Sequence, residues 1–182
     1  MKRILVLIDV QNDFITGSLR NEEAIKTVPN IVEKVKNFEG DYIFLTQDTH
    51  SEDYMATKEG EKLPVVHCID GTEGWEIEPS VAEEIDKKRQ DDKIIVETLV
   101  KPTFASFDLA REIAKIPGEL DIEFVGFCTD ICVVSNALLV KGETYNRANI
   151  KVDASCCAGV TVETHNAALL TMKMCQIDVI NQ

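Results

Sequence analysis

The sequence is poor in basic residues and lacks any long hydrophobic segment. Its 19 lysines and arginines are outnumbered by 32 aspartates and glutamates, which gives a formal net charge of −13 at pH 7. Proteins that bind nucleic acid need a basic stripe for the phosphates, so this balance argues against such a partner. The N-terminal apolar run, Ile4–Ile8, ends at Asp9 and is too short for a secretory signal or a membrane span. We therefore expect no nucleic acid and no membrane among its partners.

Histidine is also scarce, with three residues, whereas cysteine is plentiful, with six. In the absence of an export signal, this cysteine content indicates a reducing compartment, where thiols stay free and are either buried or reactive. We therefore expect a cytoplasmic protein without a disulfide framework. Four cysteines are expected to be structural or incidental, namely Cys68, Cys156, Cys157 and Cys175. The other two lie in the segment "GFCTDICVVSNAL".

Short β-branched apolar runs alternate with segments that have apolar residues at helical spacing. The runs are Ile4–Ile8, Tyr42–Thr46, Ile94–Val96, Ile122–Gly126, Ile150–Val152 and Ile177–Ile180, and the helical segments are Ile31–Phe38, Phe107–Ile116, Cys132–Tyr145 and Val162–Met174. Strands that are apolar on both faces are typical of a parallel sheet covered by helices. The pattern predicts a three-layer α/β/α fold with a mainly parallel six-stranded sheet. The length of 182 residues favours one domain over the whole chain.

Residues that could take part in catalysis or metal binding follow several of the predicted strands. They are Asp9, Asp48, His50, Lys101 and the turn Cys128–Cys132. In an open parallel sheet, ligands bind beyond the carboxyl ends of the strands, where the strand order reverses. We therefore expect all of these residues to lie at one edge of the sheet. The irregular segment 47–79 is long for a compact domain, which also points to a function.

Cys132 is either a nucleophile or a small buried hydrophobe, and free cysteine is often the latter. Its predicted place at the start of a helix favours the first interpretation, because the helix dipole and a nearby cation lower a thiol pKa. A nucleophilic cysteine also needs a base and a group that orients it. Asp9 and Lys101, at neighbouring strand ends, are candidates for these roles.

Asp48 and His50 are two residues apart, and His67 lies in the same irregular region. Carboxylate and imidazole ligands suit Zn²⁺, Fe²⁺ or Mn²⁺, and three protein ligands leave room for a substrate. The alternative is that both histidines are surface residues of an acidic loop. We expect a divalent metal site and no organic cofactor.

Several motifs together resemble the isochorismatase-like cysteine hydrolases and, within them, the nicotinamidases. The matching segments are "LVLIDVQNDFITGSL", "TQDTH", "HCIDGTEGWEI", "VKPTFASF" and "GFCTDICV", which spread from Leu5 to Val133. The resemblance implies the fold predicted above and an Asp–Lys–Cys triad formed by Asp9, Lys101 and Cys132. In that family the triad hydrolyses amides through a thioester.

The resemblance also implies a cis peptide bond at Phe127–Cys128, in the turn before the nucleophile. The N–H groups of Cys128 and Cys132 would then stabilise an oxyanion. For the metal, it implies Asp48, His50 and His67 as ligands. An additional acidic ligand would correspond to Glu59 or Glu61.

For the substrate pocket, the resemblance implies Phe14 as an aromatic wall. The chain departs from the nicotinamidases at Thr49, where they usually have tryptophan, and at Lys62–Val66, where an aromatic residue often precedes the metal histidine. Trp75 is the candidate for the missing second aromatic residue.

The expected function is therefore hydrolysis of a small carboxamide, with nicotinamide as the first candidate substrate. Two alternatives stay open, which are the same chemistry on a carbamoyl or ureido compound, and a non-catalytic thiol sensor or scaffold. True isochorismatases lack the nucleophilic cysteine, so Cys132 argues against that activity. Relatives often assemble, and we expect a homo-oligomer.

Overall fold

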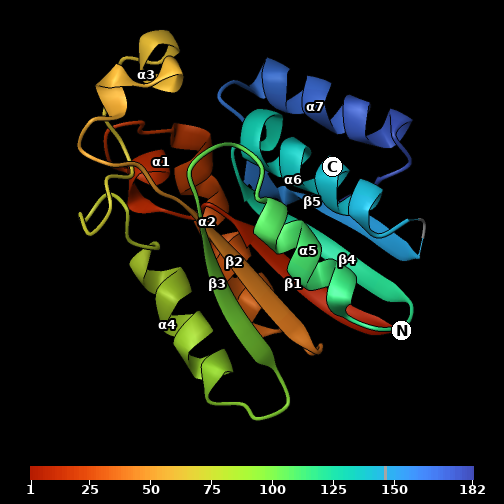
Figure 1. Ribbon diagram of the computed structural model, residues 1–182. Coiled ribbons are helices and arrows are strands. Elements are labelled where there is room, and N and C mark those ends of the chain that lie inside the picture. The colour runs from red at the N-terminus through yellow and green to blue at the C-terminus, as the bar shows by residue number, and fades with distance from the viewer. Residues whose placement is uncertain (146) are drawn as a thin grey trace.

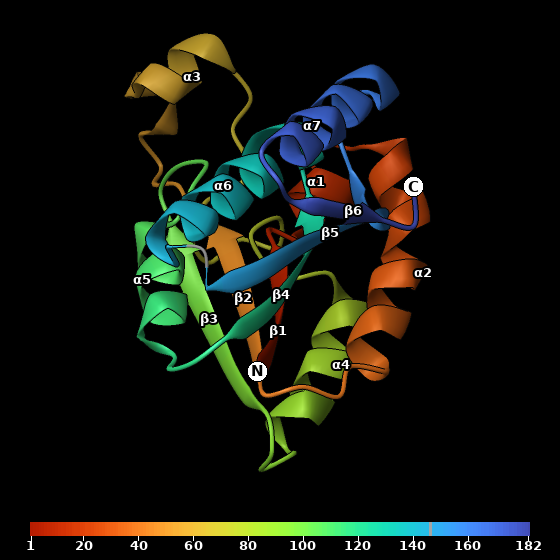
Figure 2. The same cartoon turned by 90° about the vertical axis from the view of Figure 1, so that its right-hand side faces the viewer.

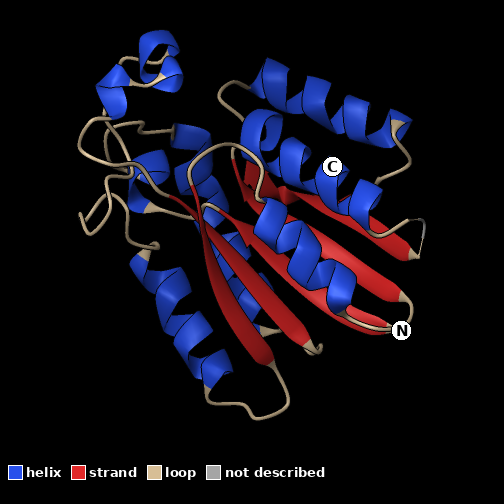
Figure 3. Ribbon diagram, in the orientation of Figure 1, coloured by secondary structure: helices blue, strands red, loops and turns tan. Residues whose placement is uncertain are grey.

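Within residues 1–145 and 147–182, which the computed structural model describes, six parallel strands form a central sheet (Figures 1 and 3). The strands are β1 (Lys2–Ile8), β2 (Tyr42–Asp48), β3 (Ile95–Lys101), β4 (Leu120–Phe127), β5 (Ala148–Ala158) and β6 (Asp178–Ile180). Their order is β3-β2-β1-β4-β5-β6, and each neighbouring pair is parallel. The strand order reverses between β1 and β4, which is where folds of this type bind ligands. The predicted α/β fold is confirmed.

Helices cover both faces of the sheet (Figure 2). They are α1 (Asn12–Ile15), α2 (Glu22–Lys36), the 3₁₀ helix η1 (Tyr54–Ala56), α3 (Lys58–Lys62), α4 (Pro79–Arg89), α5 (Phe107–Lys115), the π turn η2 (Thr129–Val133), α6 (Val134–Glu143) and α7 (Val162–Met174). Helices α2 and α4 pack on one face, and α5, α6 and α7 pack on the other. Among the described residues, no helix combines the length and the apolar character that crossing a membrane requires.

Strand β1 shows why the apolar runs are continuous. Ile4, Val6 and Ile8 belong to the core beneath α5, α6 and α7, whereas Leu5 and Leu7 belong to the core beneath α2 and α4. Both faces of the strand are therefore buried, and successive side chains enter different cores.

The structure extends several predicted elements. The run Ile94–Val96 predicts only the start of β3, because β3 is an edge strand whose exposed residues interrupt the apolar pattern before Lys101. Helix α2 starts at Glu22, well before the predicted Ile31, with Pro29 inside it. The helix predicted to begin at Cys132 begins at Val134 instead. Cys132 itself lies in the π turn η2, just before α6.

Candidate active site

A cavity of about 710 Å³ lies between the carboxyl ends of β2 and β4 and the segment containing α3. It is lined by Phe14, Ser18, Leu19, Arg20, Asn21, Glu22, Glu23, Asp48, Glu59, Leu63, His67, Phe104, Cys128, Ile131, Cys132 and Val160. Its volume is within the range that small-molecule sites occupy. The cavity therefore brings the strand ends of β2 and β4 together with the beginning of α2.

Lys101 does not line this cavity itself, but is buried behind it, in contact with the lining residues Asp48 and Cys132. Its Nζ lies 2.7 Å from Asp9 Oδ2 and 3.6 Å from Cys132 Sγ. The same ammonium donates to the carbonyl oxygen of Thr103 at 3.0 Å and to Asp48 Oδ1 at 3.2 Å. The other oxygen of Asp9 accepts a hydrogen bond of 2.6 Å from Thr46 Oγ1. An acid, a cation and a thiol from three strand ends are thus in mutual reach.

Burial dominates the electrostatics of these three groups. Burial opposes the charged form of Lys101, but the negative charges of Asp9 and Asp48 raise its pKa above the ordinary value, so that it stays an ammonium. Burial raises the pKa of Asp9, and Lys101 acts in the opposite direction. Burial, followed by the charge of Asp9, raises the pKa of the Cys132 thiol well above its ordinary value. The expectation of a lowered thiol pKa is therefore wrong for the resting site, because the carboxylate and burial outweigh Lys101.

The turn that carries Cys132 is held by close backbone packing. The peptide bond Phe127–Cys128 is cis. Gly126, just before it, has a φ of 115°, and a Cβ atom there would lie 2.8 Å from Ile8 N and still closer to the carbonyl oxygen of Ile8. Only glycine therefore fits where β4 passes the end of β1. This close approach sets the nucleophile turn beside Asp9.

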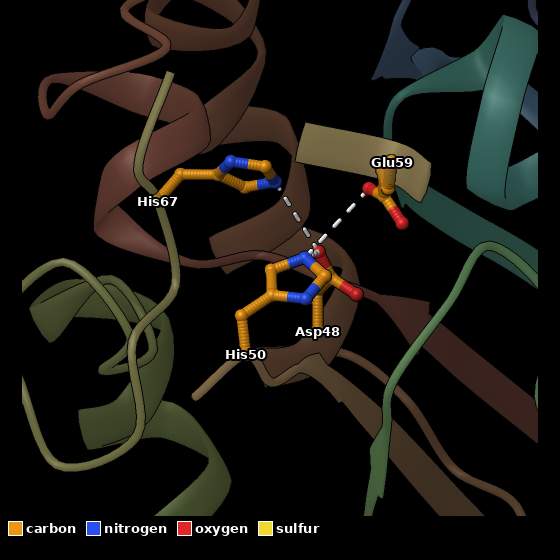
Figure 4. Close-up of side chains that lie close together, drawn as sticks. All are labelled: Asp48, His50, Glu59 and His67. Atoms are coloured by element: carbon orange, nitrogen blue, oxygen red, sulfur yellow. Dashed lines mark ion pairs between the residues drawn. The ribbon is translucent and has the colours of Figure 1, made fainter. Parts of the chain in front are cut away.

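Four side chains form a second cluster next to Lys101 (Figure 4). They are Asp48, His50, Glu59 and His67, and one ligand atom from each lies within 4.8 Å of all the others. His50 Nε2 is 3.0 Å from Asp48 Oδ2 and 3.7 Å from Glu59 Oε1. His67 Nε2 is 3.6 Å from Asp48 Oδ2. Figure 4 shows the four side chains converging on one point from β2, α3 and two loops.

The chemistry of this cluster fits a divalent metal. His50 Nε2 is buried and, although it lies 3.0 Å from Asp48 Oδ2, it makes no hydrogen bond with suitable angles to any described residue. His67 Nδ1 lies 2.8 Å from the carbonyl oxygen of Val65, so that donation from Nδ1 leaves Nε2 as a lone-pair donor. Burial and the charge of Asp48 raise the pKa of Glu59, and a bound cation would offset that repulsion. Two imidazoles and two carboxylates are a donor set for Zn²⁺ or another first-row metal.

Aromatic packing fixes the two histidines. Tyr54 is fully buried, and the centroid of its ring lies 4.6 Å from that of His50 and 4.9 Å from that of His67. Phe14 packs edge-on against His67 at 5.8 Å. Tyr54 is a residue that sequence reasoning missed, since an aromatic residue inside an irregular acidic segment carries no distinctive pattern.

The structure corrects the predicted pocket in two places. Trp75 does not line the cavity, because its Nε1 donates to Thr49 Oγ1 at 2.8 Å and its carbonyl oxygen accepts from Gln11, so it belongs to the wall behind β2. Phe104 lines the cavity instead, together with the predicted Phe14. Sequence reasoning could have found Phe104 from its position three residues after Lys101.

Between the two candidate acidic ligands, the structure places only Glu59 in the cluster. Glu61 is on the outer side of α3, where it pairs with Lys58 at 2.9 Å. His165 is away from the metal cluster, with Nδ1 2.8 Å from Thr129 Oγ1. All six cysteines are free thiols.

Comparison with known proteins identifies the family that the sequence motifs resemble. The isochorismatase domain model matches residues 3–182. A Bacillus subtilis (strain 168) protein described as an uncharacterized isochorismatase family protein, PncA, is 32% identical over 177 residues, which is 93% of each chain.

Solved structures of other proteins share the fold, and two of them serve as examples. The crystal structure of nicotinamidase PncA from Bacillus subtilis has a TM-score of 0.81 and 27% identity, covering 98% of this chain and 99% of that one. The pyrazinamidase of Pyrococcus horikoshii in complex with zinc has a TM-score of 0.78 and 22% identity, with full coverage of both chains. Because the family match extends over nearly the whole sequence, the protein belongs to the isochorismatase domain family.

Proposed function

We propose that this protein is an amidohydrolase that converts a small aromatic carboxamide, with nicotinamide as the best candidate, into the carboxylate and ammonia. The observation that carries the proposal is the position of Lys101 Nζ, 2.7 Å from Asp9 and 3.6 Å from Cys132, where Cys132 lines a cavity together with three of the four side chains that could hold a metal. The similarity to a nicotinamidase of Bacillus subtilis supports the same substrate.

In the first half of the proposed reaction, Cys132 Sγ attacks the amide carbonyl carbon, and the thiol proton passes to the carboxylate of Asp9. The carbonyl π electrons move to oxygen, and the N–H groups of Cys128 and Cys132 are assigned to the resulting oxyanion. Lys101 stays protonated and balances the negative charge that moves between Asp9 and the sulfur. The C–N bond then breaks, the nitrogen takes the proton from Asp9, and ammonia leaves an acyl thioester on Cys132.

In the second half, water attacks the thioester carbonyl carbon and gives its proton to Asp9. The C–S bond breaks, and the sulfur recovers that proton from Asp9. The carboxylic acid product ionises at neutral pH. Each half therefore uses the same base, and Asp9 ends the cycle as a carboxylate.

A divalent metal, with zinc as the first candidate, would be held by Asp48, His50, Glu59 and His67 and would supply a Lewis acid for a ring nitrogen of the substrate. Asp48, Glu59 and His67 line the same cavity as Cys132. A bound ring can therefore contact the cluster while its carboxamide faces the Cys132 thiol. In this way the cavity orients the substrate for attack.

The walls of the cavity favour a flat apolar ring. Phe14, Leu63 and Phe104 line it, and aromatic side chains accommodate ring substrates by stacking or edge contacts. A carbamoyl or ureido substrate is the second candidate, because the segment Ser18–Glu23 adds a polar wall with Arg20 and Asn21. A panel of both substrate classes separates the two, since a preference for non-aromatic substrates would remove nicotinamide.

The test of the mechanism is release of ammonia from nicotinamide by the wild type and by Cys132→Ala. The variant is expected to lose essentially all activity, and a nicotinoyl adduct is expected on Cys132 when the wild type is quenched and analysed by mass spectrometry. Cys175→Ala, at a half-buried cysteine outside the cavity, is the matched control and should keep full activity. Hydrolysis by Cys132→Ala at the wild-type rate would exclude the proposed nucleophile.

A further inference from the structure

Asn136 is a fully buried polar side chain outside the proposed triad and the metal cluster. It lies in α6, one turn after Cys132. Its Nδ2 donates to the carbonyl oxygen of Cys132 at 2.8 Å and to that of Phe104 at 2.9 Å. Its Oδ1 accepts from the backbone N–H of Ser106 at 2.9 Å. One amide group therefore joins the nucleophile turn to the loop that follows β3.

That loop, residues 102–106, controls two parts of the site. Its Thr103 carbonyl oxygen accepts a 3.0 Å hydrogen bond from Lys101 Nζ, so the loop supplies one of the three oxygen contacts that orient the ammonium, beside those of Asp9 and Asp48. Its Phe104 lines the cavity. Ser106 ends the loop and caps α5 by accepting from Leu109 N, which anchors the far side. A shift of the loop would thus move the ammonium and one wall of the cavity relative to the thiol.

We propose that Asn136 is a positioning residue for the amide hydrolysis described above, setting the separation between the Cys132 thiol and both the Lys101 ammonium and the Phe104 wall. The inference rests on the proposed function. Asparagine suits the role because its side chain offers two donor hydrogens on one nitrogen and an acceptor oxygen, and all three find partners here. Aspartate lacks both donors, and leucine lacks all three groups.

Asn136→Ser tests the link to the loop while keeping the turn. A serine hydroxyl in a helix can donate to the carbonyl oxygen four residues earlier, so it can retain the bond to Cys132 but cannot reach the loop. Asn136→Ala, which removes every bond, is the second variant. Thr144→Val is the matched control, because Thr144 is also buried in the region of α6 and its hydroxyl donates to the carbonyl oxygen of Val140, away from the cavity.

The first measurement does not depend on the substrate. Iodoacetamide alkylation of Cys132 is followed by mass spectrometry of the peptide that contains it, with the half-buried Cys175 as an internal reference. We expect alkylation about tenfold slower in both Asn136 variants, because the ammonium no longer stabilises the thiolate, and an unchanged rate at Cys175. Thr144→Val is expected to match the wild type at both cysteines.

The second measurement is steady-state hydrolysis of nicotinamide at a temperature at which every variant is folded. Both Asn136 variants are expected to lose about 30-fold in kcat, with a smaller rise in KM from the displaced Phe104. Rates of alkylation and hydrolysis within twofold of the wild type would overturn the positioning role, and so would equal losses in Thr144→Val. If the wild type fails to hydrolyse nicotinamide, the proposed function fails, whereas the alkylation rates still decide the role of Asn136.

Discussion

The carboxylate of Asp48 contacts Lys101 with one oxygen and faces the histidines with the other. Oδ1 lies 3.2 Å from Lys101 Nζ, and Oδ2 lies 3.0 Å from His50 Nε2. One side chain at the end of β2 is therefore shared by the metal cluster and the proposed triad. Losing its charge should affect both, which distinguishes Asp48 from the other candidate ligands.

This sharing predicts that Asp48→Asn is more damaging than His50→Ala at saturating zinc. Both variants should bind zinc at least about tenfold more weakly, but the first also removes a charge partner of Lys101. With enough zinc to fill the site, His50→Ala should recover part of its kcat, whereas Asp48→Asn should not. Zinc titration followed by kinetics measures this difference, and equal recovery would argue that Asp48 acts only as a ligand.

Chelation should lower the thermal stability. A metal that binds the folded chain and not the unfolded one stabilises it by about 4 kcal/mol at a thousandfold excess over Kd. We expect EDTA to lower Tm and added zinc to restore it. His67→Ala should show a much smaller response to either treatment, since it lacks one ligand. A wild-type Tm that is insensitive to both reagents would contradict a stabilising metal site.

Gly126→Ala should be strongly destabilising. The added methyl group would collide with the backbone of Ile8, and the φ of 115° is unfavourable for alanine. We expect a loss of about 3 kcal/mol or more in the free energy of unfolding, measured with urea. Gly142→Ala is the matched control, because a Cβ there meets nothing within 4 Å in helix α6. The control should gain about 0.5–1 kcal/mol.

The buried carboxylate of Asp153 should give a pH-dependent part of the stability. It lies 2.7 Å from Lys34 Nζ and accepts from Ser155 and Asn181. Burial opposes ionisation, but these partners lower the pKa of Asp153 below its ordinary value. A lowered pKa means that the stabilisation is complete above the unfolded-state pKa of about 4 and is lost as pH falls through the lower folded-state pKa.

Asp153→Asn should therefore cost about 2 kcal/mol at pH 7, and the difference from the wild type should shrink below about pH 4. Urea unfolding at pH 7, 4 and 3 provides the comparison. Lys36→Gln, at an exposed pair with Glu33 on the same helix as Lys34, should change stability little at any of these pH values. A difference that stays constant down to pH 3 would contradict a lowered pKa of Asp153 in the folded protein.

The site residues at strand ends can be predicted from the sequence, because ligands of open parallel sheets bind beyond the carboxyl ends of the strands. Asp9, Asp48 and Lys101 each terminate or follow a strand, and the carboxyl ends of parallel strands lie at one edge of the sheet. The pocket walls were less predictable. Trp75 and Phe104 are both aromatic residues in irregular segments, and only the path of the backbone places one behind β2 and the other in the cavity.

The same limit applies to interactions that have no local signature. Asn136 lies in an apolar helical pattern, in which a lone amide carries no indication of its three partners. The raised pKa of the Cys132 thiol likewise follows from its burial beside Asp9, whereas sequence spacing suggested only the helix and the cation. Periodicity identifies elements, but burial and long-range contacts require the folded chain.

Because the strands are parallel, the edge of the sheet formed by their amino ends holds none of the described side chains that are assigned to the reaction. All of the side chains assigned to the reaction lie at the carboxyl ends, and the amino ends of strands of seven or eight residues are about 20 Å away. The turn before β4 at that end contains Gly118, with a φ of 85° and open space around it. This turn is accordingly where we would attach a label or insert a short peptide, because it lies far from the side chains assigned to the reaction.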